Sequence, residues 1–169
     1  MTQPLVRIPV GVVVTRRTAD SPWIDFLWRP ETVLVGQPDT PPWTVLSAEG
    51  DTTTFYAGSA EISLFPNESA HYRSNLEGDC ALWVVLRPTE SEPPYQLFLV
   101  TADPHEGEAY TEAGNDLVET VPMPGAVREV LIAFIAEHHS GGTFVKRERK
   151  RADPEALARR VPGREDRDP

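Results

Sequence analysis

The chain has almost no cysteine. Cys80 is the only one among 169 residues, which excludes an internal disulfide and a zinc site built from several cysteines. No apolar run approaches the ~20 residues that a membrane-spanning helix requires. Arg7 interrupts the apolar stretch near the N-terminus and no small-residue cleavage site follows, so no signal peptide is predicted. We therefore expect a cytoplasmic protein.

The short motifs of common nucleotide-binding and hydrolytic enzymes are also missing. The sequence has no glycine-rich phosphate-binding loop, no paired His-Glu metalloprotease motif and no Gly-x-Ser-x-Gly elbow. Cys80 with His71 or His105 could form a nucleophile–base pair. However, Cys80 opens an apolar strand, where a single cysteine usually serves as a small hydrophobic residue. We therefore predict no catalytic residue, no metal site and no cofactor, and we favour a protein that is not an enzyme.

Positive charge is scarce in most of the chain. Residues 1–145 contain seven arginines and twenty acidic residues, whereas residues 146–169 contain nine lysines and arginines against six acids. An acidic body repels nucleic acid and anionic lipid, so binding to either is not expected unless the tail alone provides it. We predict one β-rich domain over residues 1–145 and a charged tail over residues 146–169, disordered or ordered only on a partner.

The body contains apolar, β-branched runs separated by many of the chain's seventeen prolines. At its centre, two such runs within residues 80–104 flank the acidic, proline-containing segment 89–94. This pattern predicts a hairpin with a long loop, covered on both faces. One buried face is expected to contain Leu82, Val84, Leu86, Leu97 and Leu99.

Other apolar runs predict further strands at residues 5–15, 31–35, 43–48, 52–65 and 116–121. In the run 52–65 the hydrophobic alternation changes phase near Ala57-Gly58, which indicates a bulge or corner.

Three segments carry helical signals. Asp20-Ser21-Pro22 can cap a short helical turn in which Trp23, Phe26 and Leu27 share one face. A short helix is predicted at 104–113, and a helical turn followed by a loop within 67–76. The clearest helix follows Pro124, and its apolar stripe consists of Val127, Val130, Leu131, Phe134 and Ile135.

About seven strands and a C-terminal amphipathic helix make this a mainly β (α+β) protein. We expect a partly open barrel or a sandwich that the helix plugs. Pleckstrin-homology-like domains share this order of elements, an analogy that carries no function.

Aromatic and basic residues are the candidates for partner binding. Trp23 and Trp28 lie five residues apart, so they do not share one helical face, and one of them is expected to be exposed. Aromatic residues are enriched at interface hot spots, so this segment is a candidate partner contact. The tail contains the basic run Lys146, Arg147, Arg149, Lys150 and Arg151. Docking onto an acidic protein surface, or a role in solubility alone, explains this run at least as well as nucleic-acid contact does.

A second candidate site would bind an anion. Arg16, Tyr72, Asn75 and Arg87 could line one pocket, because a guanidinium binds carboxylate or phosphate through two hydrogen bonds. Local pairing of the arginines with the surplus carboxylates is the simpler interpretation.

Several stretches, taken in order, resemble one family. They are Gly11-Val-Val-Val-x-Arg16-Arg17, Ser21-Pro-Trp23, Trp28-x-Pro30, Tyr72-x-x-Asn75-Leu76, Val84-Val-Leu-Arg87, Val100-Thr101-x-x-Pro104, Val121-Pro-Met-Pro124, and Phe134-Ile-x-x-His138-His139 followed by Lys146-Arg147. Over about residues 10–149 the sequence resembles the mainly proteobacterial family known as domain of unknown function 3305.

The resemblance implies a genomic setting and no mechanism. Genes of this family typically lie beside those for molybdenum-dependent formate dehydrogenases and their maturation factors. It thus implies a non-enzymatic accessory protein that assists assembly or maturation, with a formate dehydrogenase subunit or maturation factor as its partner. Some members carry names from molybdopterin biosynthesis, which the missing nucleotide-binding segment argues against. The alternative hypothesis is a small-molecule binding module or enzyme that uses the Arg/Tyr/Asn pocket.

Overall fold

The computed structural model of the chain describes residues 3–138, so the predictions for the tail lie outside the described residues. The strands are β1 (Val6–Thr18), β2 (Phe26–Val35), β3 (Thr44–Glu49), β4 (Thr52–Leu64), β5 (Ala81–Pro88), β6 (Tyr95–Thr101) and β7 (Leu117–Pro122). The helices are α1 (Ser69–Glu77), which follows the 3-10 turn η1 (Pro66–Glu68), then α2 (Pro104–Ala113) and α3 (Gly125–His138).

The strands form two antiparallel sheets that enclose one hydrophobic core. A four-stranded sheet has the order β2-β1-β4-β3 and a three-stranded sheet the order β6-β5-β7. The sheets meet where β4 contacts β6 and where β2 contacts β7. Within the described strands no hydrogen-bonded ladder joins the two sheets. The fold is therefore a sandwich, in agreement with the predicted class, and the strands of residues 3–138 form no closed barrel.

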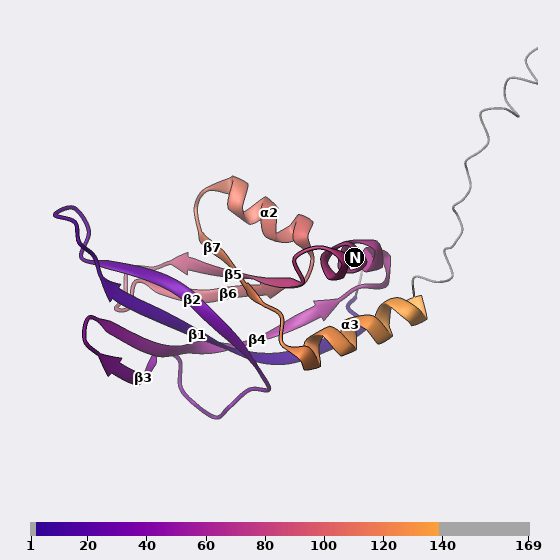
Figure 1. Cartoon of the computed structure of the whole chain (residues 1–169), viewed down its shortest axis with the longest axis horizontal. Helices are drawn as coiled ribbons and strands as arrows, with labels where there is room; N and C mark the ends of the chain where they lie inside the picture. Colours follow the sequence, from indigo (N-terminus) through magenta and orange to yellow (C-terminus); the bar gives the residue numbers. More distant parts are fainter. Residues whose placement is uncertain (1–2, 139–169) are drawn as a thin grey trace, which may run out of the picture.

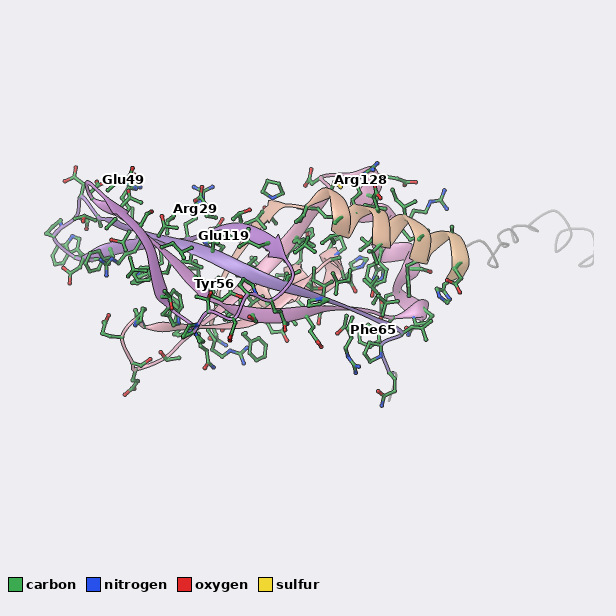
Figure 2. All side chains as sticks on the ribbon, turned by 90° about the horizontal axis from the view of Figure 1, so that it is seen from below. Arg29, Glu49, Tyr56, Phe65, Glu119 and Arg128 are labelled. Carbon is green, nitrogen blue, oxygen red and sulfur yellow. The ribbon has the colours of Figure 1, made fainter. Side chains whose placement is uncertain are left out.

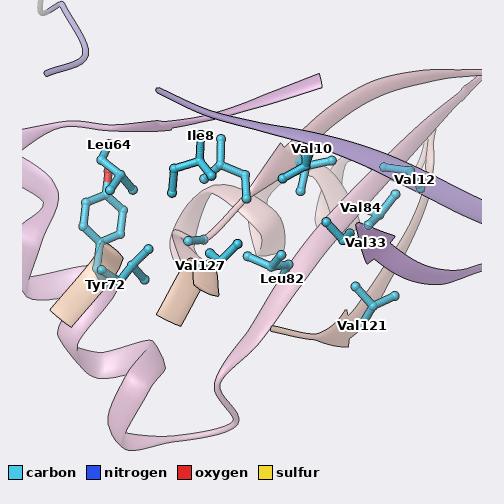
Figure 3. Close-up of a cluster of buried hydrophobic side chains, with 14 of the residues drawn as sticks. Ile8, Val10, Val12, Val33, Leu64, Tyr72, Leu82, Val84, Val121 and Val127 are labelled. Carbon is cyan, nitrogen blue, oxygen red and sulfur yellow. The ribbon is translucent and has the colours of Figure 1, made fainter. Parts of the chain in front are cut away.

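The core comes from the inward faces of both sheets. Figure 3 shows side chains of the four-stranded sheet, among them Val10 and Val33, facing Leu82, Val84 and Val121 of the three-stranded sheet. All five are at most 3% exposed. Burial of this apolar surface is the main driving force of the fold.

The helices cover one end and one face of the sandwich (Figure 1). The stripe predicted for α3 is confirmed: Val127, Leu131 and Phe134 are buried in the core. α1 packs against α3, and both lie at the same end of the molecule. α2 lies on the face of the three-stranded sheet that points away from the core. No helix among residues 3–138 is long and apolar enough to cross a membrane.

The predicted phase change in β4 is confirmed. β1 and β4 pair continuously except at one point, where Val12 lies opposite Gly58 and Val13 opposite Tyr56. Ala57 is the extra residue, so this is a β-bulge. The bulge lets both halves of a 13-residue strand keep an apolar side toward the core.

The central hairpin is also confirmed, but one of its predicted buried residues is not on the core face. Val85 lies opposite Leu99 and Leu86 opposite Leu97, which leaves Phe98 as an extra residue. Side chains after this bulge change faces. Leu97 therefore packs on the core, whereas Leu99 pairs with Val85 on the opposite face.

The predicted helical turn around Trp23 is wrong. Residues 19–25 form a loop, and β2 begins at Phe26, where it pairs with the end of β1. This ladder with β1 outweighs the short helical pattern. Pro30 is tolerated because β2 is an edge strand and Pro30 lies at a register shift. By contrast, the helical turn expected within 67–76 is extended into the full helix α1.

Candidate functional site

An aromatic cluster fills the end of the sandwich opposite α1 and α3. Trp28 of β2 is its centre, with ring centroids at 5.7 Å from Phe55, 5.9 Å from Tyr95, 6.0 Å from Trp43 and 6.3 Å from Phe26. These residues come from both sheets. The cluster therefore holds the two sheets together at an end that none of the helices within residues 3–138 covers.

Arg16 of β1 lies over this cluster. The central carbon of its guanidinium is 4.4 Å from the ring centroid of Phe26 and 5.4 Å from that of Phe55. One terminal nitrogen donates a hydrogen bond of 3.2 Å to Oγ1 of Thr53. Such cation–π contacts are worth about 0.5–2 kcal/mol each. Contacts from the two neighbouring strands, β2 and β4, thus fix the guanidinium on the aromatic rings.

The four-stranded sheet reaches beyond the three-stranded sheet at this end. Figure 1 shows the connection between β1 and β2 projecting past β5 and β6. Figure 2 places Glu49, the last residue of β3, at this end of the elongated molecule, while Phe65 lies toward the end with α3. Among residues 3–138, no second layer covers the apolar side chains of this overhang.

We call this region the open aromatic end. It consists of Arg16, Trp23, Ile24, Phe26, Trp28 and Val45. Trp23, in the loop before β2, is 88% exposed, Val45 is 54% exposed and Ile24 is 49% exposed. Exposed apolar side chains gathered in one region mark interaction surfaces more often than isolated ones do. The structure therefore places both predicted tryptophans here: Trp28 as the base and Trp23 as the exposed tip.

Tyr72 and Asn75, from the predicted anion pocket, are buried structural residues of α1. The hydroxyl of Tyr72 accepts a hydrogen bond of 2.9 Å from the backbone N–H of Phe65. Burial raises the pKa of Tyr72 to about 12. The Asn75 amide donates to the carbonyls of Ala81 and Ala102 at 2.8 and 2.9 Å, and its oxygen accepts from the N–H of Ala81. The hydrogen bonds of both side chains thus hold α1 against the ends of the neighbouring strands.

Arg87 has a carboxylate partner within the chain. Its guanidinium forms two hydrogen bonds of 3.0 Å with the Asp116 carboxylate and lies 3.5 Å from the ring centroid of Phe98. This hydrogen-bonded pairing lowers the pKa of Asp116. Arg87 therefore pairs with a carboxylate of its own chain, which is the simpler of the two interpretations given for the arginines.

The structure does not bring the four predicted anion-binding residues together. Tyr72 is tied to Phe65, next to the start of β1, where Val6 pairs with Leu64. Arg16 lies ten residues further along β1, about 30 Å away at ~3.3 Å per residue. Asn75 holds the first residue of β5, and Arg87 lies near the other end of that strand.

Sequence reasoning missed a histidine–carboxylate cluster between α1 and α2. His71 of α1 lies beside Asp103 and His105 at the start of α2. An open pocket of about 330 Å³ is lined by these three residues together with Phe65, Glu68, Tyr72 and Glu106. Asp103 before Pro104 is a visible helix-start signal, but no local pattern links it to His71, 32 residues earlier. Within residues 3–138, no hydrogen bond joins either histidine to Cys80.

Comparison with known proteins gives one family match. A family model described as "Protein of unknown function (DUF3305)" matches residues 9–150. No curated protein and no solved structure gives a significant match. The matched range contains nearly all of the described sandwich, including the open aromatic end and the histidine–carboxylate cluster.

Proposed function

The chain belongs to the DUF3305 family, and on that premise we propose that it is a non-enzymatic accessory protein that binds a partner through the open aromatic end. The partner we propose is a subunit or a maturation factor of a molybdenum-dependent formate dehydrogenase. This choice of partner rests on the genomic setting that the family resemblance implies. The role would be assistance in assembly or maturation of that enzyme.

The observation that carries the proposal is the exposure of Trp23. An indole that is 88% exposed, with Ile24 and Phe26 beside it, costs free energy through contact with water. Covering these side chains with a partner removes that cost. Tryptophan is also among the residues most enriched at binding hot spots.

The base of the surface supports the same interpretation. Trp28 contacts four other rings, and Arg16 is held by Thr53 and by the rings of Phe26 and Phe55. Side chains that are already ordered lose little conformational entropy on binding. The open aromatic end therefore combines an ordered base with an exposed apolar tip.

Affinity purification with Trp23→Ala tests the proposal. The matched control is Val35→Ala, which removes an exposed apolar side chain at the far end of β2, the strand that follows Trp23; Val35 is 51% exposed. We expect the unaltered protein to recover a formate dehydrogenase subunit or maturation factor. With the purified partner, Trp23→Ala should weaken binding at least tenfold, about 1.4 kcal/mol, and Val35→Ala should leave it unchanged.

A chain that ends at Phe144 separates the tail from the body. The candidate contacts from Lys146 to Arg151 lie outside the described residues, and their role in partner binding stays a prediction. Weaker recovery with the shortened chain would assign contact to the tail as well. Recovery of neither proposed partner, or equal binding by Trp23→Ala and the unaltered protein, would overturn the proposal.

A further inference from the structure

We propose that His71, Asp103 and His105 bind one divalent transition-metal ion, with Glu68 as a fourth ligand. The site lies between α1 and α2, at the opposite end of the sandwich from the open aromatic end. It is separate from the proposed partner-binding surface. Metal binding at this site can therefore be tested separately from the proposed function.

The ligand atoms converge on one small volume. Nδ1 of His71 lies 3.1 Å from each carboxylate oxygen of Asp103 and 2.8 Å from Oε1 of Glu68. Nδ1 of His105 lies 4.0 Å from Oδ1 of Asp103. One ligand atom from each of His71, Asp103 and His105 lies within 4.8 Å of the other two. Ligands of a tetrahedral zinc ion are about 3.4 Å apart, given bonds of ~2.1 Å.

Only small side-chain movements separate this arrangement from a coordinated ion. The His71 and His105 rings are edge to face, with centroids 4.0 Å apart. The His105 side chain is 72% exposed, so it is free to rotate its nitrogen toward the other ligands. His71 is one-third exposed and Asp103 is 12% exposed, so these two ligands form the fixed part of the site.

The charge of the pocket favours a cation. Its lining has three carboxylates, from Glu68, Asp103 and Glu106, and within the described part of the chain neither arginine nor lysine lines it. The arginine of α1, Arg73, instead pairs with Glu77 at 3.0 Å. Two carboxylates face a single imidazole nitrogen, which holds at most one proton. A divalent ion in this space would offset both negative charges.

The surrounding hydrogen bonds hold Asp103 in place before any ion arrives. Its Oδ1 accepts from the backbone N–H of His105 at 2.9 Å, as expected for the cap of α2. Its own N–H donates to Oγ1 of Thr101, whose hydroxyl donates to Glu106 at 2.7 Å. Asn75 ties α1 to the carbonyl just before Asp103. Outer contacts of this kind orient metal ligands and raise affinity.

The donor set selects a class of metal. Imidazole nitrogen suits zinc, nickel, cobalt and iron, whereas magnesium and calcium prefer oxygen ligands alone. The pocket of about 330 Å³ is open above the ligands, so water can occupy the remaining coordination positions. Coordination by His71 and His105 would link α1 to α2, elements that otherwise meet through few contacts.

Zinc titration of the untagged full-length protein, freed of metal with a chelator, tests the site. Isothermal titration calorimetry should show one zinc ion per chain with a micromolar or lower Kd, and no comparable binding of magnesium. Cobalt should give the visible absorption bands of a nitrogen-ligated ion. His105→Ala should weaken zinc binding at least tenfold, and Glu68→Gln severalfold, with far-UV circular dichroism unchanged.

His138→Gln is the matched control, because it removes a histidine on α3 that packs on Phe134 outside the cluster. Zinc binding that persists in this variant and falls in His105→Ala supports the site. The proposed site is wrong if zinc binds more weakly than about millimolar, since contacts of His71 with Glu68 and Asp103 then account for the cluster without an ion. It is also wrong if His105→Ala binds zinc as tightly as the unaltered protein does.

Discussion

At the scale of single residues, Tyr72 shows how one hydroxyl is accommodated in an apolar core. Its side chain is 1% exposed, and Figure 3 shows its ring beside Leu64. Its hydroxyl supplies the acceptor for the N–H of Phe65, where the chain leaves β4. The raised pKa follows chiefly from burial, because the phenolate would lose its hydration, and the charges of Asp103, Glu68 and Glu106 act in the same direction.

Tyr72→Phe should lower the free energy of unfolding at pH 8 by about 1–3 kcal/mol, because the N–H of Phe65 loses its buried acceptor. Between pH 10 and 12, the unfolded tyrosine ionises at its ordinary pKa of 10.0, while the folded one keeps its proton to about 12. The contribution of Tyr72 to the free energy of unfolding therefore decreases as the pH rises over this range. Urea denaturation at pH 8, 10 and 11 should show the two proteins converging. A constant difference would contradict this prediction.

The Arg87–Asp116 pair predicts the opposite pH dependence. Pairing lowers the pKa of Asp116 below its usual 3.8 in the folded state. The carboxylate therefore stabilises the fold above pH ~4, and this contribution is lost as the pH falls through the lowered pKa. Asp116→Asn should melt at a lower temperature than the unaltered protein at pH 7, and the gap should narrow toward pH 2.5. Thermal melts of both proteins at the two pH values measure this. The same difference in melting temperature at pH 7 and pH 2.5 would contradict the prediction.

At the scale of the elements, α2 depends on close contact with β5. A Cβ added at Gly107 would lie 2.2 Å from Cγ of Trp83, the root of a large ring that has little freedom to retreat. The helix can therefore approach the sheet this closely only because position 107 has no side chain. The same approach sets the place of Asp103 and His105 relative to His71.

Gly107→Ala should destabilise the protein by about 1–3 kcal/mol, the usual cost of overpacking, despite the better helix propensity of alanine. It should also weaken zinc binding, because α2 carries two of the proposed ligands. Chemical denaturation and zinc titration measure the two effects. Gly125→Ala is the control, since a Cβ there meets nothing within 4 Å. Equal stability of the two variants would show that α2 adapts freely.

Features that depend on local sequence spacing could be predicted. Features that depend on which strand lies alongside could not. The bounds of α2, the stripe of α3 and the bulge at Ala57 all follow from local spacing, and the structure has all three. The start of β2 and the bulge at Phe98 depend on which strand lies alongside. The local pattern before β2 favoured a helical turn, and the pattern of β6 favoured an unbroken alternation of buried and exposed side chains.

The same distinction applies to the candidate sites. Trp23 and Trp28 are both candidates in the sequence, because two tryptophans five residues apart do not share one helical face. That helical turn is wrong, and only the structure shows that Trp23 is the exposed one. The contact between His71 and His105 depends on how α1 and α2 pack around Asn75. The two histidines are 34 residues apart, and no local pattern in a single sequence predicts a contact over that distance. Arg87 was expected to pair with some carboxylate, but only the topology selects Asp116.

At the scale of the whole molecule, the described residues alone supply one large hydrophobic core. Its buried members extend from Ile8 to Phe134. A chain that ends at Phe144 should therefore keep its cooperative thermal transition, with a change in Tm of less than about 2 °C. Differential scanning calorimetry of both lengths measures this. A larger loss would mean that residues beyond 144 contribute to the fold.

The position of α3 also has a consequence for how the protein is made. β1 leaves the ribosome before the other described strands, yet its neighbour β4 begins only at Thr52. Val127 and Leu131 of α3 also belong to the core, and they are made much later. During synthesis, apolar strands of both sheets stay uncovered until nearly all of the sandwich has emerged. Exposed strands of this kind aggregate or recruit chaperones. The nascent chain should therefore depend on chaperones until α3 is released.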